Sequence, residues 1–469
     1  MQHHDDDQAI IEAGYKPQLK RSLGPFASFA IPFSEISITT GIFANYGFVL
    51  AKAGPFGFWT WLLVAFGQTM VALVLAEMAG RIPLAGSLYN WNNKLANPMV
   101  GWFTGWMLMV AFAIGTAAVT TTMLPVIGVI LGYDLDPHMA SAIAIALILG
   151  QLIINLYGAR LTSHINIIAV VAEIISMVGL GILITFIIAA KGHFHFDLLT
   201  TIPTEPRPYL PGFLMSSLLC AWTIIGFECS ADVSEETVNA KRVTPKGMLS
   251  AVLISGLVGF AFIVIMTIAI PDLAEVSKAS YPLAVIITHY LGSSGTNLFL
   301  AFVLTSMFAC AMVVMMTATR VLFAMARDDR FIASSVFKKV SAHHVPKNAA
   351  LLIAALTIIF VLMGDNLTLL AGASTVCAGL YYLITVISFG ITVPKLPDTH
   401  TFSLGRWHWP VVIIAALWLI IEIGILTIPD EFHAGALTAA GVVVAGVVVY
   451  FITGRKNKSS SREDAHGGP

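Results

Sequence analysis

Apolar runs of about 20 residues recur along the whole chain, and they constrain the fold more than any other feature. A helix of that length crosses the hydrocarbon core of a bilayer, where the backbone must satisfy its own hydrogen bonds. Of the 469 residues, 57% are hydrophobic and 11% are charged, against about 25% charged in soluble domains. We predict an all-α integral membrane protein with twelve spans, near 23–50, 58–79, 99–131, 139–157, 165–190, 212–235, 247–270, 295–327, 349–364, 367–393, 409–428 and 434–453.

The loop charges predict the orientation of these spans. With a cytoplasmic N-terminus, most loop Lys and Arg residues fall inside, and only Lys52, Lys191, Arg207 and Lys278 fall outside. Such a positive-inside bias, with an even number of spans, places both termini in the cytoplasm. We therefore expect a multi-pass protein of the cell membrane. Its membrane domain covers 21–454, and its cytoplasmic tails, 1–20 and 455–469, are predicted to be disordered.

Composition and missing motifs exclude several function classes. The net charge of -1 argues against a nucleic-acid partner. None of the 13 histidines lies mid-span, although haem ligation would require axial histidines there. The chain contains no G-x-x-x-x-G-K-[ST] motif for ATP drive. The cysteines lie in apolar runs without metal-ligand spacing, at Cys220, Cys229, Cys310 and Cys377. We expect no metal, no cofactor, no disulfide and no enzymatic activity.

Two predicted spans carry interruptions at corresponding places. The first reads F-S-E-I-S-I-T-T-G-I-F-A-N-Y-G-F over 33–48, and its polar and small residues predict a break near Thr39-Thr40-Gly41. The sixth is interrupted about halfway, at Gly226-Phe227-Glu228. Matching breaks in two five-span halves indicate an inverted-repeat transporter with its binding site at the midplane. The alternative is that these are small residues at ordinary helix crossings.

Acidic residues inside spans are costly and favour a functional interpretation. We consider five of the acids in the predicted spans: Glu35, Glu77, Glu173, Glu228 and Glu422. Glu77 precedes Arg81 by one helical turn, so we predict a structural pair or simple solvation there. For Glu422, in span eleven, we predict a packing or peripheral role. Glu35, Glu173 and Glu228 lie deeper and are the functional candidates.

Several motifs resemble those of the amino acid–polyamine–organocation permeases. T-T-G-I-F in span one resembles their G-S-G-I-F break, and I-G-F-E in span six resembles their G-F-E or G-F-D. A-E-M-A-G-R-I-P-L-A-G-S-L-Y and S-E-E-T-V-N-A-K-R-V-T-P-K-G-M resemble their two conserved loops. The A-D-V-S-E-E-T wording leans toward the amino acid, GABA and choline permeases. The resemblance extends over about 23–453. Thr39 and Thr40 depart from it, standing where the family often has Gly and Ser.

The resemblance implies ten core helices in two inverted repeats, 23–190 and 212–393, with peripheral helices over 409–453. It places the substrate carboxylate at the start of the second half of span one, at Thr39, Thr40, Gly41 and Ile42. A helix N-terminus also suits an anion on physical grounds. The ammonium group would meet freed carbonyls at Trp222, Thr223 and Ile225. Gly226 and Glu228 complete the expected site. Trp222 is either a lid over the amine or an ordinary packing aromatic.

Glu173 is the candidate for ion coupling. In one branch of the family, the pattern N-x-x-x-V-x-x-K in span five ends in a lysine that stands in for a sodium ion of distant relatives. Here the pattern runs from Asn166 to Glu173. A buried carboxyl there could carry a proton, hold a cation or pair with another group. Glu228 competes for the proton role. Thr305 and Ser306 fall where sodium-coupled relatives place hydroxyl ligands.

We expect a secondary-active carrier that imports an amino acid or related amine by alternating access, coupled to protons or to sodium. Substrate would enter between spans one, three, six, eight and ten, while a four-helix bundle rocks against the remaining core. Within this class the alternatives are an amino-acid exchanger and a carrier of a carboxylate-free amine, such as choline, ethanolamine or a polyamine. Two other classes remain open: a nutrient receptor built on a transporter fold and a channel-like facilitator.

Overall fold

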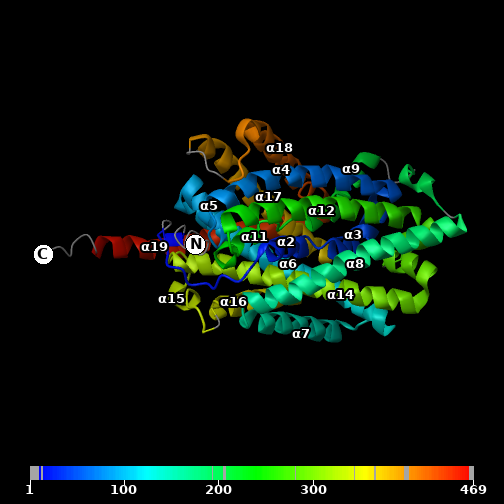
Figure 1. Cartoon of the computed structure of the whole chain (residues 1–469), viewed down its shortest axis with the longest axis horizontal. Helices are drawn as coiled ribbons and strands as arrows, with labels where there is room; N and C mark the ends of the chain where they lie inside the picture. Colours follow the sequence, from blue (N-terminus) through cyan, green and yellow to red (C-terminus); the bar gives the residue numbers. More distant parts are fainter. Residues whose placement is uncertain are drawn as a thin grey trace.

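A computed structural model describes residues 10–11, 14–192, 194–203, 208–279, 281–342, 344–363, 366–395 and 401–463, with side chains described up to 453. The long helices run side by side along the longest axis of the molecule (Figure 1). Over these ranges the secondary structure is helical, and the sole β feature is a parallel bridge between Leu23 and Thr237. The predicted all-α class is confirmed for this part of the chain.

Most helix bounds lie within several residues of the predicted spans, except at the two breaks and at the start of span eight. The first half contains α2 (Pro25–Ile36), α3 (Ile38–Ala53), η1 (Pro55–Trp59), α4 (Thr60–Arg81), α5 (Ser87–Leu95), α6 (Pro98–Leu131), α7 (Pro137–Leu156), α8 (Ala159–Lys191) and η2 (Phe196–Leu199). The second half contains α9 (Tyr209–Met215), α10 (Leu218–Thr223), α11 (Cys229–Asp232), η3 (Ser234–Glu236), α12 (Ala240–Ile268), α13 (Leu273–Lys278), α14 (Pro282–Arg327), α15 (Ser334–Phe337), α16 (Lys347–Met363) and α17 (Leu367–Thr392). After η4 (Val393–Lys395) and η5 (Gly405–Trp407) come α18 (His408–Ile425), η6 (Asp430–Phe432) and α19 (His433–Glu463).

Ten helical stretches within the described ranges are long and apolar enough to cross a membrane. The predicted span over 349–364 corresponds to α16, a shorter apolar helix, and the span over 212–235 is divided among α9, α10 and α11. These two differences separate the ten stretches from the twelve predicted spans. The twelve-helix count and the inverted repeat therefore stay predictions. α14 is kinked at Gly292, which has a φ of 66°, so it begins well before the predicted span over 295–327.

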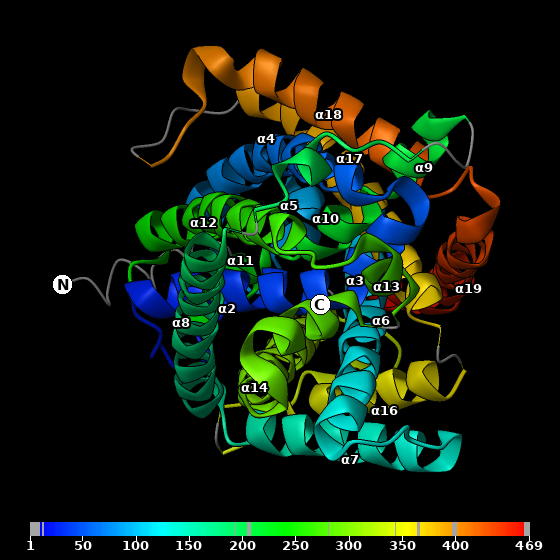
Figure 2. The ribbon, with the colours of Figure 1, turned by 90° about the vertical axis from the view of Figure 1, so that its right-hand side faces the viewer.

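The core of the bundle is formed by the broken helices and their neighbours. In Figure 2, α2, α3, α6 and α10 lie centrally, while α7, α8 and α18 form the periphery. The outer face of α8 shows why it lies there: Ile168, Ile175, Ile182 and Phe186 are 65–72% exposed. Their spacings of seven, seven and four residues place them on one helical stripe. An exposed apolar stripe on a spanning helix faces lipid.

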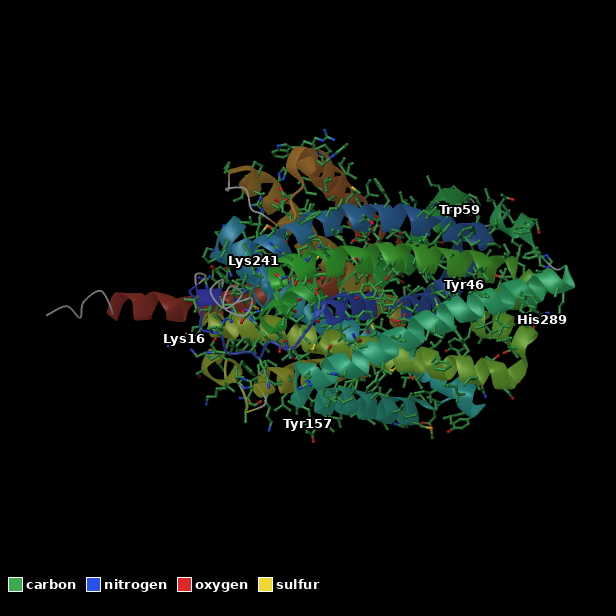
Figure 3. The ribbon with its side chains drawn as sticks, viewed as in Figure 1. Lys16, Tyr46, Trp59, Tyr157, Lys241 and His289 are labelled. Carbon is green, nitrogen blue, oxygen red and sulfur yellow. The ribbon has the colours of Figure 1, made fainter. Side chains whose placement is uncertain are left out.

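Two basic residues from segments predicted to be cytoplasmic, Lys16 and Lys241, lie at the same end of the bundle (Figure 3). Figure 3 places Lys16 and Lys241 at one end, and Trp59 and His289 at the other. We call the first the basic end. The assignment of this end to the cytoplasm stays a prediction. Arg207 lies outside the described residues, as do the side chains of the basic residues beyond 453.

Part of the N-terminal tail is ordered against this end, so the predicted disorder of 1–20 is wrong for residues 14–20. Leu19 is buried against Ala85 and Phe323, and the Tyr15 hydroxyl donates to Asp328 at 3.2 Å. Burial of an apolar side chain offsets the entropy of ordering such a segment. At the other end of the chain, α19 continues to Glu463, so the predicted disorder of 455–469 is wrong for residues 455–463. Residues 1–9 and 464–469 lie outside the described part of the chain.

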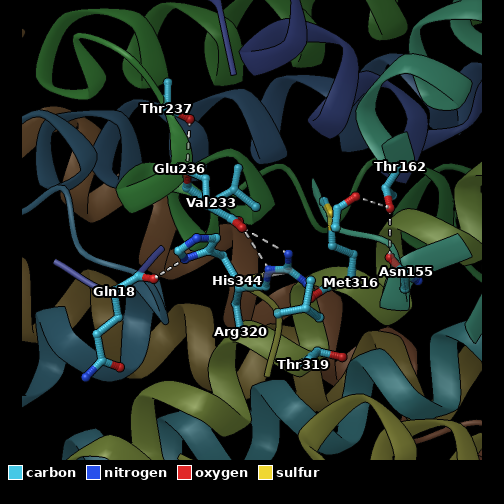
Figure 4. Close-up of polar contacts among 12 residues, drawn as sticks. Gln18, Asn155, Thr162, Val233, Glu236, Thr237, Met316, Thr319, Arg320 and His344 are labelled. Carbon is cyan, nitrogen blue, oxygen red and sulfur yellow. Dashed lines mark hydrogen bonds and ion pairs between the residues drawn. The ribbon is translucent and has the colours of Figure 1, made fainter. Parts of the chain in front are cut away.

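Buried ion pairs hold the basic end together. The Arg320 guanidinium donates to both carboxylate oxygens of Glu236, at 3.1 and 3.2 Å (Figure 4). Arg327 donates to both oxygens of Glu235 at 3.0 Å. Such bidentate pairs fix geometry as well as charge. They connect α14 to the segment that follows the sixth span.

Two of the acids noted in the sequence, Glu77 and Glu422, are bonded to neighbouring protein groups. Glu77 accepts from Arg81 at 2.9 and 2.7 Å and from the Leu404 amide at 2.9 Å. Glu422 accepts from the Gln68 side-chain amide with both oxygens, at 2.9 and 3.1 Å. Both carboxylates thus have direct protein partners, as buried polar groups generally do.

Candidate functional site

Span one is broken at a single residue, Ser37. α2 ends at Ile36, Ser37 adopts a left-handed conformation (φ 34°, ψ 84°), and α3 begins at Ile38. The predicted break near Thr39-Thr40-Gly41 was therefore a few residues too late, because these residues form the first turn of α3. The Ser37 hydroxyl lies 2.6 Å from the Thr40 hydroxyl and accepts from the Thr40 amide at 3.4 Å. This is N-cap chemistry, which satisfies a helix-terminal donor.

Span six is interrupted over a longer segment. α10 ends at Thr223 and α11 begins at Cys229, with Gly226 between them at a φ of 77°. The Gly226 amide donates to the Tyr382 hydroxyl at 3.0 Å, and this hydroxyl in turn donates to Glu228. The ring of Phe227 stacks on Tyr382, with centroids 5.3 Å apart. Tyr382, from α17, therefore supports the interruption on both sides of Phe227.

The two interruptions touch each other. A Cβ atom added at Gly41 would lie 2.7 Å from Cβ of Thr223, and one added at Gly226 would lie 2.8 Å from Cδ of Glu35. Both distances are too short for a side chain. The two glycines thus allow the first turn of α3 to approach α10, and the sixth-span interruption to approach α2.

A pocket lies where the two broken helices meet. It is lined by both breaks and by α6, α14 and α17. These are the elements of spans one, six, three, eight and ten, between which we expected substrate to enter. Five predicted site residues line it, namely Thr40, Gly41, Trp222, Thr223 and Ile225. Glu35 and Ser37 also line it.

The other predicted site residues lie beside the pocket rather than along it. Ile42 is fully buried in the apolar core. Gly226 and Glu228 lie behind the pocket against Tyr382. Thr39 does not line the pocket: its hydroxyl donates to Glu173 and lies 3.4 Å from the hydroxyl of the lining residue Ser37. The structure therefore brings most of the predicted site residues together, with some lining the pocket and the others lying behind it.

Glu173 already occupies the start of α3. One of its oxygens, Oε1, accepts from the Thr39 amide at 3.1 Å and from the Thr39 hydroxyl at 2.8 Å. Its other oxygen has no hydrogen-bond partner among the described residues, and the side chain is 1% exposed. An anion at a helix N-terminus is favoured by the helix dipole and the unpaired amides. The Thr39 amide, which we predicted to meet the substrate, thus has an internal acceptor.

The hydroxyl pair predicted in span eight divides between two surroundings. Ser306 is buried, with its Oγ 3.0 Å from Oγ1 of Thr39. Thr305 is exposed and donates to the Ala301 carbonyl at 2.8 Å. Ser306 alone therefore joins the Thr39–Glu173 cluster. Among the described residues, no group of three or more His, Cys, Asp or Glu side chains could hold a metal ion.

Several lining residues were missed in the sequence. α6 contributes Phe112, Gly115 and two further apolar residues to the pocket, and nothing in their local pattern distinguishes them from other residues of a long apolar helix. Tyr381 lines the pocket, and the adjacent Tyr382 contacts the span-six interruption. Two adjacent tyrosines inside an apolar span were a signal that could have been used, because a buried hydroxyl needs a partner.

Comparison with known proteins supplies the family. The family model described as amino acid permease matches residues 23–452. The amino-acid permease BAT1 of Arabidopsis thaliana is 28% identical over 94% of this chain and 92% of its own length. Its homolog in Oryza sativa subsp. japonica is 29% identical over 95% of this chain and 92% of its own. The thiamine transporter thi9 of Schizosaccharomyces pombe is 22% identical over 96% of this chain and 85% of its own.

Proposed function

Because the chain belongs to the amino acid permease family, we propose that it imports an amino acid or related amine by alternating access, coupled to protons. The observation that carries this proposal is the pocket between the two broken helices. Thr40 and Gly41 stand there at the N-terminus of α3, opposite Trp222 and Thr223 of α10.

The pocket offers complementary groups to the two ends of a zwitterion. The N-terminus of α3 carries a partial positive charge and suits a carboxylate. The end of α10 at Thr223 carries carbonyl groups released by the interruption, which suit an ammonium group. Trp222 is 6% exposed and lines the same pocket, where its ring can also attract a cation. An amino acid would therefore bind with its carboxylate toward α3 and its amine toward α10.

Glu173 links this site to a proton. It lies behind the first turn of α3, bonded to Thr39, so its protonation state acts on the helix end that meets the substrate. A carboxylate there competes with the substrate carboxylate for the positive end of α3, whereas a protonated carboxyl does not. Proton binding and substrate binding would then favour each other, which is the requirement for symport.

Ligand stabilisation tests the binding site directly. The detergent-purified protein would be heated with neutral, acidic and basic amino acids, GABA, choline, ethanolamine, putrescine and thiamine. A ligand present at 100 times its Kd stabilises the folded state by about 2.7 kcal/mol. We expect amines with a carboxylate to raise the midpoint. If only carboxylate-free amines raise it, the assignment of the α3 N-terminus as a carboxylate site is wrong.

A carboxylate-free amine is the second candidate substrate. Glu35 lines the pocket, where Thr317 donates to it at 3.5 Å, so a carboxyl is present that could meet a cation. One relative is named as a thiamine transporter, and thiamine is a cation without a carboxylate. In this case Glu35→Gln would abolish stabilisation by the amine and leave stabilisation by amino acids unaltered.

The coupling role of Glu173 has its own test. Glu173→Gln keeps an oxygen that can accept from Thr39 but removes the titrating group. We expect substrate counterflow in proteoliposomes to persist and uptake to lose its dependence on an imposed pH gradient. Uptake by this variant that still follows the gradient as in the parent protein would remove Glu173 from the coupling mechanism. A sodium gradient in place of the pH gradient separates the two ions.

A further inference from the structure

Asp232 is a buried acid that the proposed function does not use. It lies four residues after Glu228, and its amide donates to the Glu228 carbonyl at 3.3 Å. The two side chains therefore project from the same side of one helical turn. Asp232 is 0% exposed, and neither of its carboxyl oxygens has a hydrogen-bond partner among the described residues. A buried carboxyl without a partner is costly and requires an explanation.

Two serines near Asp232, one in space and one in sequence, also have buried hydroxyls without a hydrogen-bond partner among the described residues. Ser87, on α5, lies close enough to interact with the Asp232 carboxyl, although the two groups do not reach the geometry of an ordinary hydrogen bond. Ser234 follows two residues after Asp232 in η3. Both serines are 0% exposed, and neither hydroxyl has a partner within the described part of the chain. Buried polar groups that face each other without bonding are typically bridged by ordered water. Ser87 and Asp232 come from separate elements, so their approach is not a property of one helix end.

The charged groups around Asp232 do not neutralise it. The ionisable side chains in electrostatic contact with it are Glu35, Glu228 and Cys229. None of these groups supplies a positive charge. Glu228 and Asp232, which lie one helical turn apart, repel each other when both are ionised.

The nearby basic residues have other positions or partners. Arg21 donates to the carbonyls of Ser234 and Thr237, at 3.3 and 2.8 Å. Two arginines of α14, which packs against α11, are bonded elsewhere: Arg320 to Glu236 and Arg327 to Glu235. At the start of α12, Arg242 and Lys246 are exposed and Lys241 is partly exposed. Among the described residues, none of these basic groups forms an ion pair with Asp232.

We infer that Asp232 accepts the proton released by Glu228 and passes it to the aqueous phase at the basic end of the bundle. This inference rests on the proposed proton-coupled function. The route begins at Glu35, which lines the pocket and is in electrostatic contact with both Glu228 and Asp232. Glu228 has one oxygen bonded to Tyr382 and one, Oε1, without a partner among the described residues.

The proton balance along this route is simple. Glu228 loses its proton from Oε1 and becomes a carboxylate, and water held beside Ser87 carries the proton to Asp232. Asp232 becomes a carboxylic acid, then returns to a carboxylate when it releases the proton to solution. Glu235 and Glu236 follow Asp232 in the chain and are bonded to the arginines of α14. Opening of these ion pairs would give Asp232 access to the basic end.

The test compares proton movement with substrate exchange. Proteoliposomes containing a pH-sensitive dye would report substrate-linked proton flux, and labelled substrate would report counterflow, which needs no net proton transfer. For Asp232→Asn we expect proton flux to fall at least about tenfold, as expected on removing a proton-transfer group, while counterflow persists. The matched control is Glu422→Gln, which alters a buried carboxyl whose oxygens are both bonded to Gln68. We expect it to keep both activities.

A second variant guards against misfolding. Ser87→Ala removes only the unpartnered hydroxyl, and we expect proton flux to slow by about two- to tenfold, the equivalent of one hydrogen bond. If both variants move protons with substrate as the parent protein does, the relay is wrong. If Asp232→Asn loses dependence on a sodium gradient instead, the site binds sodium and the relay is also wrong. If the parent protein exchanges substrate without any proton flux, the proposed coupling itself fails, and the relay fails with it.

Discussion

The two interruptions that meet at the pocket are built in different ways. In span one a single residue, Ser37, leaves the helical conformation, and its own hydroxyl caps the helix that follows. In span six the helix is open from Thr223 to Cys229, and it is supported from outside, by Tyr382 of α17. Span one thus resumes its helix at once, whereas span six depends on another helix.

This difference separates the chemistry available at the two breaks. The short break presents an intact helix N-terminus, which is a site for negative charge, and Glu173 already places a carboxyl behind it. The long break exposes backbone carbonyls and brings Glu228 beside a tyrosine hydroxyl. We therefore expect span one to be sensitive mainly to close packing, and span six to the conformation and hydrogen bonds of its backbone.

The largest effect is expected at Gly226. Gly226→Ala places a Cβ on a residue with a φ of 77° and against Glu35. A left-handed conformation alone costs a non-glycine residue about 1–2 kcal/mol, and the overlap with Glu35 adds to that cost. We expect transport to fall to background and the thermal midpoint to drop. Proteoliposome uptake and detergent thermal unfolding measure the two effects.

A helical glycine provides the control for this substitution. Gly179 lies in α8 with no atom near the position of an added Cβ. Gly179→Ala should leave transport intact and stability unchanged, or raised by up to about 1 kcal/mol. Normal uptake by Gly226→Ala would show that the span-six interruption tolerates an ordinary backbone conformation, and the contrast between the two breaks would be lost.

Gly41 should also be intolerant of a side chain, because of an overlap with one neighbour that a second substitution can remove. Gly41 lies in the first turns of α3, and its added Cβ would overlap the Thr223 side chain. Gly41→Ala should cost about 1–3 kcal/mol through overpacking. Combining it with Thr223→Gly should recover part of that loss, with an interaction energy of about 0.5–3 kcal/mol for contacting residues.

The double-variant cycle distinguishes the two glycines. Thermal midpoints of Gly41→Ala, Thr223→Gly and the combination give the interaction energy directly. Additive losses in the combined variant would mean that Gly41 is required by its own backbone, as Gly226 is. The comparison between a packed break and a conformational break would then be wrong.

Tyr382 tests the outside support of span six. Tyr382→Phe keeps the ring stacked on Phe227 but leaves the Gly226 amide and one Glu228 oxygen without their partner. Buried groups left in this state cost about 1–3 kcal/mol, and we expect the transport rate to fall as well. Tyr46→Phe is the control, because its hydroxyl lies 2.8 Å from the hydroxyl of Thr267, away from both interruptions. Equal transport by the two variants would contradict a special role for Tyr382.

The sequence predicted the elements of this site better than its contacts. Apolar runs of bilayer length form helices in lipid, so the spans can be predicted from composition. The pairing of Glu77 with Arg81 can be predicted from their helical spacing. The exact position of the break could not be predicted from the sequence, because Thr39-Thr40-Gly41 has a lower helix propensity than Ser37. Ser37, with Thr40 three residues later, was an N-cap signal in the sequence that helix propensity does not capture.

Contacts between distant segments could not be predicted from local pattern. The approach of Gly226 to Glu35, the bond from Tyr382 to Glu228 and the position of Ser87 opposite Asp232 each join residues from different helices. A buried polar residue needs a partner, but the local pattern does not say which helix supplies it. The paired tyrosines and Asp232 were visible in the sequence as polar groups without an assigned partner. A role for the tyrosines and for Asp232 could be proposed only once their neighbours in the fold were known.

Ser37 gives the smallest expected effect and the sharpest view of the short break. Ser37→Gly loses the cap but accepts the left-handed conformation, so it should cost only a few tenths of a kcal/mol. Ser37→Ala loses the cap and keeps the strain, and it should cost about 1–2 kcal/mol. Thermal unfolding of the two variants, read against each other, isolates the conformational part. If alanine is tolerated as well as glycine, Ser37 does not hold a left-handed break. Span one would then bend gradually, through Thr39 to Gly41, as its sequence alone suggests.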